Sequence, residues 1–174
     1  ITLAKDIVNG YRVKKRRKRL MKNHRSFELY RPNQLVDFLN FLKDNPEETF
    51  VYVLVKPQTE AKVTYNRFTG EQQTKQPLNI LPASDYGHFV FCLEQSSQII
   101  YSPQPFVHKM KKNLKDIRQK DYILCMGDPS IIAISSAIAS DTTQGKINML
   151  KWDRQEKRYY PLSFKLYEKG EIDE

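Results

Sequence analysis

Cysteine is scarce in this sequence, with only Cys92 and Cys125 in 174 residues. A fold held together by disulfides needs several cysteine pairs, so a small secreted scaffold of that kind is not expected. Both cysteines lie in apolar segments, HFVFCLE and YILCMG, where a free thiol behaves as a small buried hydrophobic side chain. We therefore expect two reduced thiols on core strands and a cytoplasmic protein, in a host cytoplasm or a virion if the protein is viral.

Long apolar runs are also missing. No segment approaches the roughly eighteen consecutive apolar residues that a transmembrane helix needs, so no membrane span is predicted. The printed sequence begins with Ile1 and not with Met, which indicates a fragment or a processed chain. Its first residues lack the charged, apolar and small-residue succession of a signal peptide.

Recognisable catalytic and metal-binding motifs are absent as well. The three histidines, His24, His88 and His108, are far apart, with no HExxH and no paired CxxC. The segments GDPS at Gly127 and GK at Gly145 each resemble part of a phosphate loop, but neither has the GxxxxGK[ST] spacing. We therefore predict no metal, no cofactor and no catalytic residue, and an enzyme remains only a third alternative.

Carboxylates are the remaining candidates for a metal nuclease, which would cluster them near a lysine. Four of them fall near the ends of expected strands: Asp121, Asp128, Asp153 and Glu156. Their spacing matches no catalytic pattern, so no site is assigned to them.

What the sequence does contain is a concentrated block of positive charge, RVKKRRKRLMKNHR at residues 12–25, without an acidic residue. Its basic residues are Arg12, Lys14, Lys15, Arg16, Arg17, Lys18, Arg19, Lys22 and Arg25. These nine residues account for the whole formal net charge of +9. The high pI therefore describes one segment of the chain, and this segment indicates a polyanionic partner.

Three interpretations of this block are open. Lysine and arginine neutralise phosphates and release counterions, which favours sequence-independent binding of DNA or RNA. An acidic protein surface would attract the same charges; a membrane surface is a weaker alternative, because the block lacks the apolar face of an interfacial helix. The block could also be a solvated helix, and KKRRKR matches a simple nuclear-localisation pattern.

Helical periodicity dominates the first part of the chain. Leu3, Ile7, Val8 and Tyr11 have helical spacing, and this helix is expected to continue through the basic block as an arm. A second helix is predicted over RPNQLVDFLNFLKDN, with Pro32 in its first turn and its end at Asn45-Pro46.

From Thr49 the pattern changes to strands. TFVYVLVK is a continuous β-branched and aromatic run and predicts a buried strand. KVTYN and EQQTKQ flank Arg67-Phe68-Thr69-Gly70, which predicts an exposed hairpin with glycine at its tip. Phe68 is the one aromatic residue expected to be exposed, and with Arg67 it is a candidate for stacking on bases.

Four other aromatic residues are further candidates for base stacking. Tyr65, Trp152, Tyr159 and Tyr160 could also form stacking platforms. Aromatic residues on strands more often form core or cross-strand pairs, and that is the interpretation we favour for them.

The remainder of the chain predicts strands and helices in alternation. HFVFCLE and QIIYS are expected to form a hairpin across 95–97, followed by a helix in PQPFVHKMKKNLKDIRQK. DYILCMG predicts a short strand, and DPSIIAISSAIAS a helix with Asp128 as N-cap and Pro129 at its first position. INMLKWD and RYYPLSFKLY are expected to pair across 154–157.

These elements predict an α+β fold, with a largely antiparallel sheet of about seven strands covered by helices and an N-terminal basic helical arm. Four strand segments are expected to share one sheet: Phe50 to Val55, Phe89 to Leu93, Ile123 to Met126 and Ile147 to Trp152. The expected division is a basic arm over 1–25 and one α+β domain over 26–174.

The block from Gly127 to Phe164, with GDP before a small-residue helix and LKWDRQ before a tyrosine-bearing strand, resembles uncharacterised small proteins of T4-like phages, particularly those of marine cyanobacteria. The resemblance implies a viral origin and carries over no functional residue.

Two functions follow from the sequence. The first is a non-enzymatic, sequence-independent nucleic-acid-binding protein that acts through the basic arm. The second is a structural or assembly protein, such as a virion component, whose arm docks on an acidic partner or a neighbouring subunit of a homo-oligomer.

Overall fold

The computed structural model describes residues 23–58, 62–75, 79–95 and 103–168. Its main sheet contains β1 (Ser26–Glu28), β2 (Phe50–Val55), β5 (His88–Leu93), β6 (Tyr122–Leu124), β7 (Lys146–Asp153) and β8 (Arg158–Lys165). The helices are α2 (Pro32–Asp44), α3 (Pro103–Asn113) and α4 (Pro129–Thr142), with a 3-10 helix η1 (Leu81–Asp85). A separate two-stranded hairpin consists of β3 (Lys62–Tyr65) and β4 (Gln72–Lys75).

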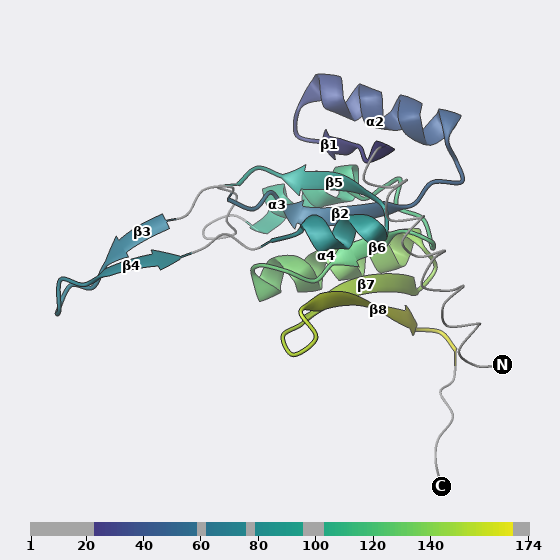
Figure 1. Ribbon diagram of the computed structural model, residues 1–174. Coiled ribbons are helices and arrows are strands. Elements are labelled where there is room, and N and C mark those ends of the chain that lie inside the picture. The colour runs from purple at the N-terminus through teal and green to yellow at the C-terminus, as the bar shows by residue number, and fades with distance from the viewer. Residues whose placement is uncertain (1–22, 59–61, 76–78, 96–102, 169–174) are drawn as a thin grey trace, which may run out of the picture.

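The main sheet is mostly parallel. Its six strands follow the order β1-β5-β2-β6-β7-β8, and only the last pair, β7 with β8, is antiparallel (Figure 1). The combination of helices and strands is as predicted. The expectation of a largely antiparallel sheet of about seven strands is wrong, although the four strand segments expected to share one sheet do so.

The central strands are continuously apolar because both faces of the sheet are covered. In β2 every residue from Phe50 to Leu54 is buried, and all six residues of β5 are buried. Alternation between apolar and polar residues is typical of antiparallel sheets with one solvated face, whereas parallel strands are buried on both faces. The run FVYVLV was correctly interpreted as a buried strand, but its pairing was not.

The connections between parallel strands place the helices. Going from β1 to β2, from β5 to β6 and from β6 to β7, the chain moves across the sheet in one direction, through α2, α3 and α4. Going from β2 to β5 it moves in the opposite direction, through η1. Because crossovers between parallel strands are right-handed, connections that run in opposite directions cover opposite faces.

The hydrophobic core consists of two clusters, one on each face of the sheet. On one face, Phe38 of α2, Met110 of α3 and Ile131 of α4 pack against alternate residues of the strands, such as Tyr52. On the other face, Ala83 of η1 packs with the intervening residues of the same strands. The sheet is therefore the middle layer of the domain.

The predicted helices after the arm are confirmed, although α3 ends at Asn113, before the end of the segment expected to be helical, PQPFVHKMKKNLKDIRQK. Helix α2 has proline in its first turn, and its C-cap residue Asn45 donates its backbone N–H to the Phe41 carbonyl. Helix α4 begins after Asp128, whose side chain accepts from the Ser130 N–H, so the predicted N-cap is also confirmed. The pairing of β7 with β8 across 154–157 is as predicted.

Two predicted elements lie wholly or almost wholly outside the described residues. The helix over the basic arm lies almost entirely outside them, as does QIIYS, the expected hairpin partner of β5. Within the described residues β5 instead pairs with β1 and β2. No helix in the described part of the chain is long and apolar enough to cross a membrane.

Candidate functional site

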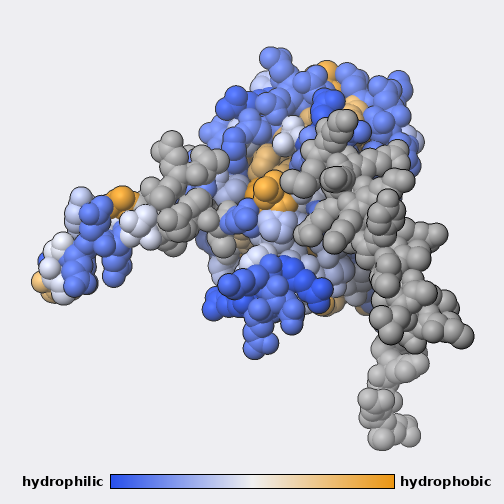
Figure 2. Space-filling model, in the orientation of Figure 1, coloured by the Kyte–Doolittle hydropathy of each residue, from blue (hydrophilic) through white to orange (hydrophobic). Residues whose placement is uncertain are grey.

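The β3–β4 hairpin projects from the body of the domain, at the left of Figure 1, and its surface is mainly hydrophilic (Figure 2). Its strands pair in register from Lys62↔Lys75 to Tyr65↔Gln72. Gly70 has a φ of +68°, a conformation that L side chains rarely adopt, and its N–H donates to the Asn66 carbonyl to close the turn. The predicted exposed hairpin with glycine at its tip is confirmed.

The hairpin tip carries an exposed aromatic residue beside an arginine. Phe68 is 98% exposed and Tyr65 is 68% exposed. The Phe68 N–H donates to Asn66 Oδ1 at 2.9 Å, so its backbone is held while its ring points into solvent. Arg67 is also exposed and forms no ion pair among the described residues. The predicted exposure of Phe68 is confirmed, and base stacking by it stays a prediction.

The other aromatic candidates follow the prediction only in part, because Tyr65, expected to pack in the core or across strands, is exposed on the hairpin. Trp152 and Tyr159 pack on each other, with ring centroids 4.8 Å apart, in the cluster on the η1 face. The Tyr159 hydroxyl donates to the Asn79 carbonyl at 3.1 Å. These two rings belong to the core, whereas Tyr65 and Phe68 of the hairpin are exposed.

Eight of the predicted nucleic-acid-binding residues lie outside the described residues, namely Arg12, Lys14, Lys15, Arg16, Arg17, Lys18, Arg19 and Lys22. The ninth, Arg25, is described. Its guanidinium lies over the rings of Phe27 and Phe41, at 5.5 and 5.2 Å from their centroids, while its side chain stays exposed. A cation–π contact leaves the edge of a guanidinium available, so Arg25 can still donate to a phosphate.

The segment before β1 is anchored by two histidines. His24 Nε2 lies 2.9 Å from the Gly87 carbonyl, and the Arg25 N–H donates to His88 Nδ1 at 2.9 Å. His88 Nε2 faces Glu48 Oε2 at 3.4 Å, without hydrogen-bond geometry. Because Nδ1 accepts a hydrogen bond, the proton of the neutral ring is on Nε2.

Burial lowers the pKa of His24 and, although Glu48 opposes the effect, also that of His88. Both rings therefore stay neutral to a lower pH than a free histidine does. Protonation of His88 would replace its acceptor at Nδ1 by a donor facing the Arg25 N–H, so this anchor weakens in acid.

The structure does not bring Arg25 together with Arg67 and Phe68. Arg25 directly precedes β1, at the amino edge of the parallel strands. The hairpin follows the carboxyl end of β2, at the opposite edge. The predicted site residues that the structure describes, Arg25, Arg67 and Phe68, therefore lie on two separate surfaces.

At the carboxyl edge lies a polar network that sequence reasoning missed. Glu28, at the end of β1, is 7% exposed and forms ion pairs with Lys56 and with Arg31. Tyr30 donates its hydroxyl to Glu28 Oε1 at 2.8 Å, and the Glu28 N–H donates to Gln34 Oε1 at 2.7 Å. The hydrogen bond from Lys56 lowers the pKa of Glu28, and burial raises the pKa of the Tyr30 phenol.

This network could have been suspected from one signal. Glu28 lies between the apolar residues Phe27 and Leu29, and Lys56 directly follows the apolar strand β2. Polar residues at the carboxyl ends of buried strands often belong to sites in sheets of this kind. The sequence does not show, however, that β1 and β2 run parallel in one sheet. It therefore does not place Glu28 and Lys56 at the same edge.

The described residues form a mostly parallel sheet with three α-helices on one face and η1 on the other, a projecting hairpin and a polar carboxyl edge. A family model described as Phage Pam3 gp32-like protein matches residues 49–166. This match covers more than half of the 174 residues, so the chain belongs to the phage Pam3 gp32-like family. No curated protein and no solved structure matches the chain.

Proposed function

We propose that this phage-family protein is a non-enzymatic, sequence-independent nucleic-acid-binding protein. The basic segment 12–25 would neutralise phosphates, and the hairpin tip would make a second contact. The observation that supports this proposal best is the tip itself, where Phe68 is 98% exposed next to Arg67 on a hairpin that leaves the domain.

A stacking role explains why an aromatic residue occupies that position. Phe68 makes no ring contact with another described residue, so it contributes little to the folded core. Every base offers a flat face, and stacking on an aromatic side chain contributes about 1–3 kcal/mol per base without sequence preference. Arg67 beside the ring supplies a positive charge for the adjacent phosphate.

The distance between Arg25 at the amino edge and the β3–β4 hairpin sets the minimum length of a nucleic-acid strand that contacts both. Strand β2 has six residues, which span about 20 Å at roughly 3.3 Å per residue. At the rise of about 3.4 Å per nucleotide of a stacked, duplex-like strand, reaching from the amino edge to the hairpin takes more than roughly six nucleotides. In this proposal residues 1–25 act as a basic arm on a single domain formed by 26–174.

An assembly role is the second candidate, and the edge strand β8 supports it. Among the described residues nothing pairs with the outer edge of β8, and Phe164, Leu166 and Tyr167 near its end are 42%, 58% and 76% exposed. Such an edge can pair with another chain. In this version the arm docks on an acidic partner or a neighbouring subunit, and the protein is a virion component.

The likeness of Gly127–Phe164 to proteins of T4-like cyanobacterial phages falls inside the matched range 49–166. We propose a phage of that group as the source. This proposal names no residue role, and it is independent of which of the two functions holds.

Fluorescence anisotropy with labelled single-stranded oligonucleotides of six and twenty nucleotides tests the role of the tip. Phe68→Ala should weaken binding to the longer strand roughly tenfold, because one stacked base is lost. Phe68→Trp should retain affinity, since it keeps the aromatic face. Gln73→Ala, an exposed change on β4 of the same hairpin, is the matched control and should bind as the wild type does.

Equal affinities for Phe68→Ala and Gln73→Ala would remove the tip from the interface. Equal affinities for both strand lengths would contradict a partner that spans the two surfaces. Homo-oligomers that disappear when Phe164 is replaced by Lys, with no change in nucleic-acid affinity, would favour the assembly role.

A further inference from the structure

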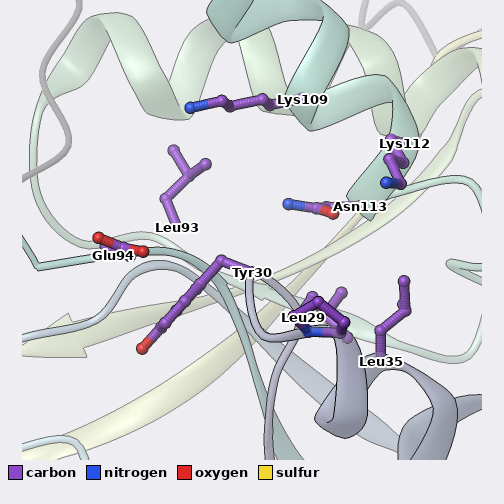
Figure 3. Close-up of a pocket in the computed structure, with 9 residues that line it drawn as sticks. Leu29, Tyr30, Leu35, Leu93, Glu94, Lys109, Lys112 and Asn113 are labelled. Atoms are coloured by element: carbon purple, nitrogen blue, oxygen red, sulfur yellow. The ribbon is translucent and has the colours of Figure 1, made fainter.

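A pocket of about 350 Å³ opens beside the Glu28 network, between the carboxyl ends of β1 and β5, the start of α2 and the end of α3 (Figure 3). In parallel sheets, ligands bind outside the carboxyl ends of the strands. Small-molecule pockets range from about 300 to 1,000 Å³, so this volume suits one compact ligand.

The walls of the pocket differ in chemistry. Leu29, Leu35 and Leu93 form an apolar side, and Lys109 and Lys112 project from α3 toward the other side (Figure 3). The two lysines are three residues apart, which places them on one helix face. Neither forms an ion pair among the described residues, which leaves both ammonium groups available to an anion.

Two acceptors complete the lining. Glu94 follows β5 and has no ion pair within the described part of the chain. Asn113, which is 8% exposed, donates its Nδ2 to the Cys92 carbonyl at 2.7 Å, and this bond fixes the orientation of its amide. The Tyr30 hydroxyl is directed away from the pocket, toward Glu28, so the phenol braces the wall and does not face the ligand (Figure 3).

We propose that this pocket binds a nucleoside monophosphate. The phosphate would lie between Lys109 and Lys112 and accept charge-assisted hydrogen bonds from both ammonium groups. The apolar side, formed by the three leucines, would contact the flat base. Glu94 would accept hydrogen bonds from ribose hydroxyls or from a base amine. This proposal does not depend on nucleic-acid binding by the arm or by the hairpin.

Isothermal titration calorimetry with adenosine 5′-monophosphate tests the site. The wild type should bind this nucleotide, and adenosine, which lacks the phosphate, should bind at least roughly tenfold more weakly. The double variant Lys109→Gln/Lys112→Gln should lose at least roughly tenfold in affinity. Lys111→Gln changes an exposed lysine of the same helix that does not line the pocket, and it should bind as the wild type does.

Amide chemical shifts locate the ligand. Addition of the nucleotide should shift the resonances of Leu29, Glu94 and Asn113 in the wild type and leave them unchanged in the double variant. The proposal is overturned by absence of binding at millimolar nucleotide, by equal affinity for adenosine, or by an equal loss in Lys111→Gln. A variant with glutamine at 14–19 should keep nucleotide affinity, which separates this site from the arm.

Discussion

Replacing Asp121 by alanine should be among the most destabilising single changes in the domain, because its carboxylate joins the start of β2 to the loop that precedes β6. Oδ1 accepts from the Phe50 N–H and from Arg118 Nη2, both at 3.0 Å, and Oδ2 accepts from the Arg118 N–H at 2.9 Å and from Nε at 3.1 Å. The side chain is fully buried. Arg118, held in this way, donates to the carbonyls of Pro46 and Glu48 at 2.7 and 2.6 Å.

The magnitude follows from what is left unpaired. Asp121→Ala leaves two backbone N–H groups without an acceptor, at about 1–3 kcal/mol each, and leaves Arg118 half-buried without its partner. Removing one partner of a buried ion pair costs about 3–5 kcal/mol. These costs overlap, so we expect a total loss of about 3–5 kcal/mol in the free energy of unfolding. Asp121→Asn keeps one acceptor oxygen and should lose about 2 kcal/mol.

Urea denaturation followed by circular dichroism measures the loss. The midpoint should fall while the slope stays the same, since the surface exposed on unfolding does not change. In thermal melts each kcal/mol shifts the midpoint by about 2–4 °C for a domain of this size. Asp141→Ala, an exposed change on α4, is the control and should stay within about 0.5 kcal/mol. A loss below about 1 kcal/mol for Asp121→Ala would refute the reasoning.

Two further predictions concern titration and thiol reactivity. The pKa values of His24 and His88 in the folded protein are lowered from the ordinary value of 6.5. As the pH falls, the unfolded chain therefore takes up protons at these histidines before the folded protein does. The free energy of unfolding should be highest above pH 6.5 and should decrease as the pH drops below it. His88→Asn, which keeps an acceptor for the Arg25 N–H, should reduce the slope of unfolding free energy against pH between 7.5 and 5.5, and an unchanged slope would count against this assignment. Cys92 is buried on β5, as expected, and its thiol pKa is raised, whereas the expectation for Cys125 is wrong, because it follows β6 and is half-buried. A thiol reagent should therefore label Cys125 first, and faster labelling of Cys92 would contradict the packing.

Elements with strong local patterns could be predicted from the sequence. Leu35, Phe38, Leu39 and Leu42 repeat at helical spacing, and α2 forms where they predict it. The hairpin tip was also predictable, because Gly70 and polar flanking strands are local signals. These features depend on residues within a few positions of one another.

The parallel pairing and the carboxyl-edge pocket could not be predicted in the same way. Strand β1 has only three residues, and the charged Glu28 within it gives no strand signal; its buried carboxylate is compensated by Lys56, far along the chain. The continuous run of β2 indicated burial on both faces, but not which strands flank it. The pocket combines residues 29–35, 93–94 and 109–113, which only the tertiary fold brings together.

The salt dependence of nucleic-acid binding tests the central claim most directly. Each phosphate that the basic segment neutralises should contribute roughly 0.7–0.9 to the slope of log affinity against log salt. Engaging five or six charges would therefore give a slope of about −4 to −5. No sequence preference is expected, because phosphate contacts position a protein without reading bases.

Anisotropy titrations with single- and double-stranded oligonucleotides across a salt series give this slope. A variant with glutamine at Lys14, Lys15, Arg16, Arg17, Lys18 and Arg19 should lose binding and flatten the slope, while its circular dichroism spectrum stays that of the wild type. Phe68→Ala, with the basic segment intact, should bind more weakly but keep the slope. Wild-type protein that does not bind at low salt, or a glutamine variant that binds equally well with the same slope, would contradict the nucleic-acid-binding function.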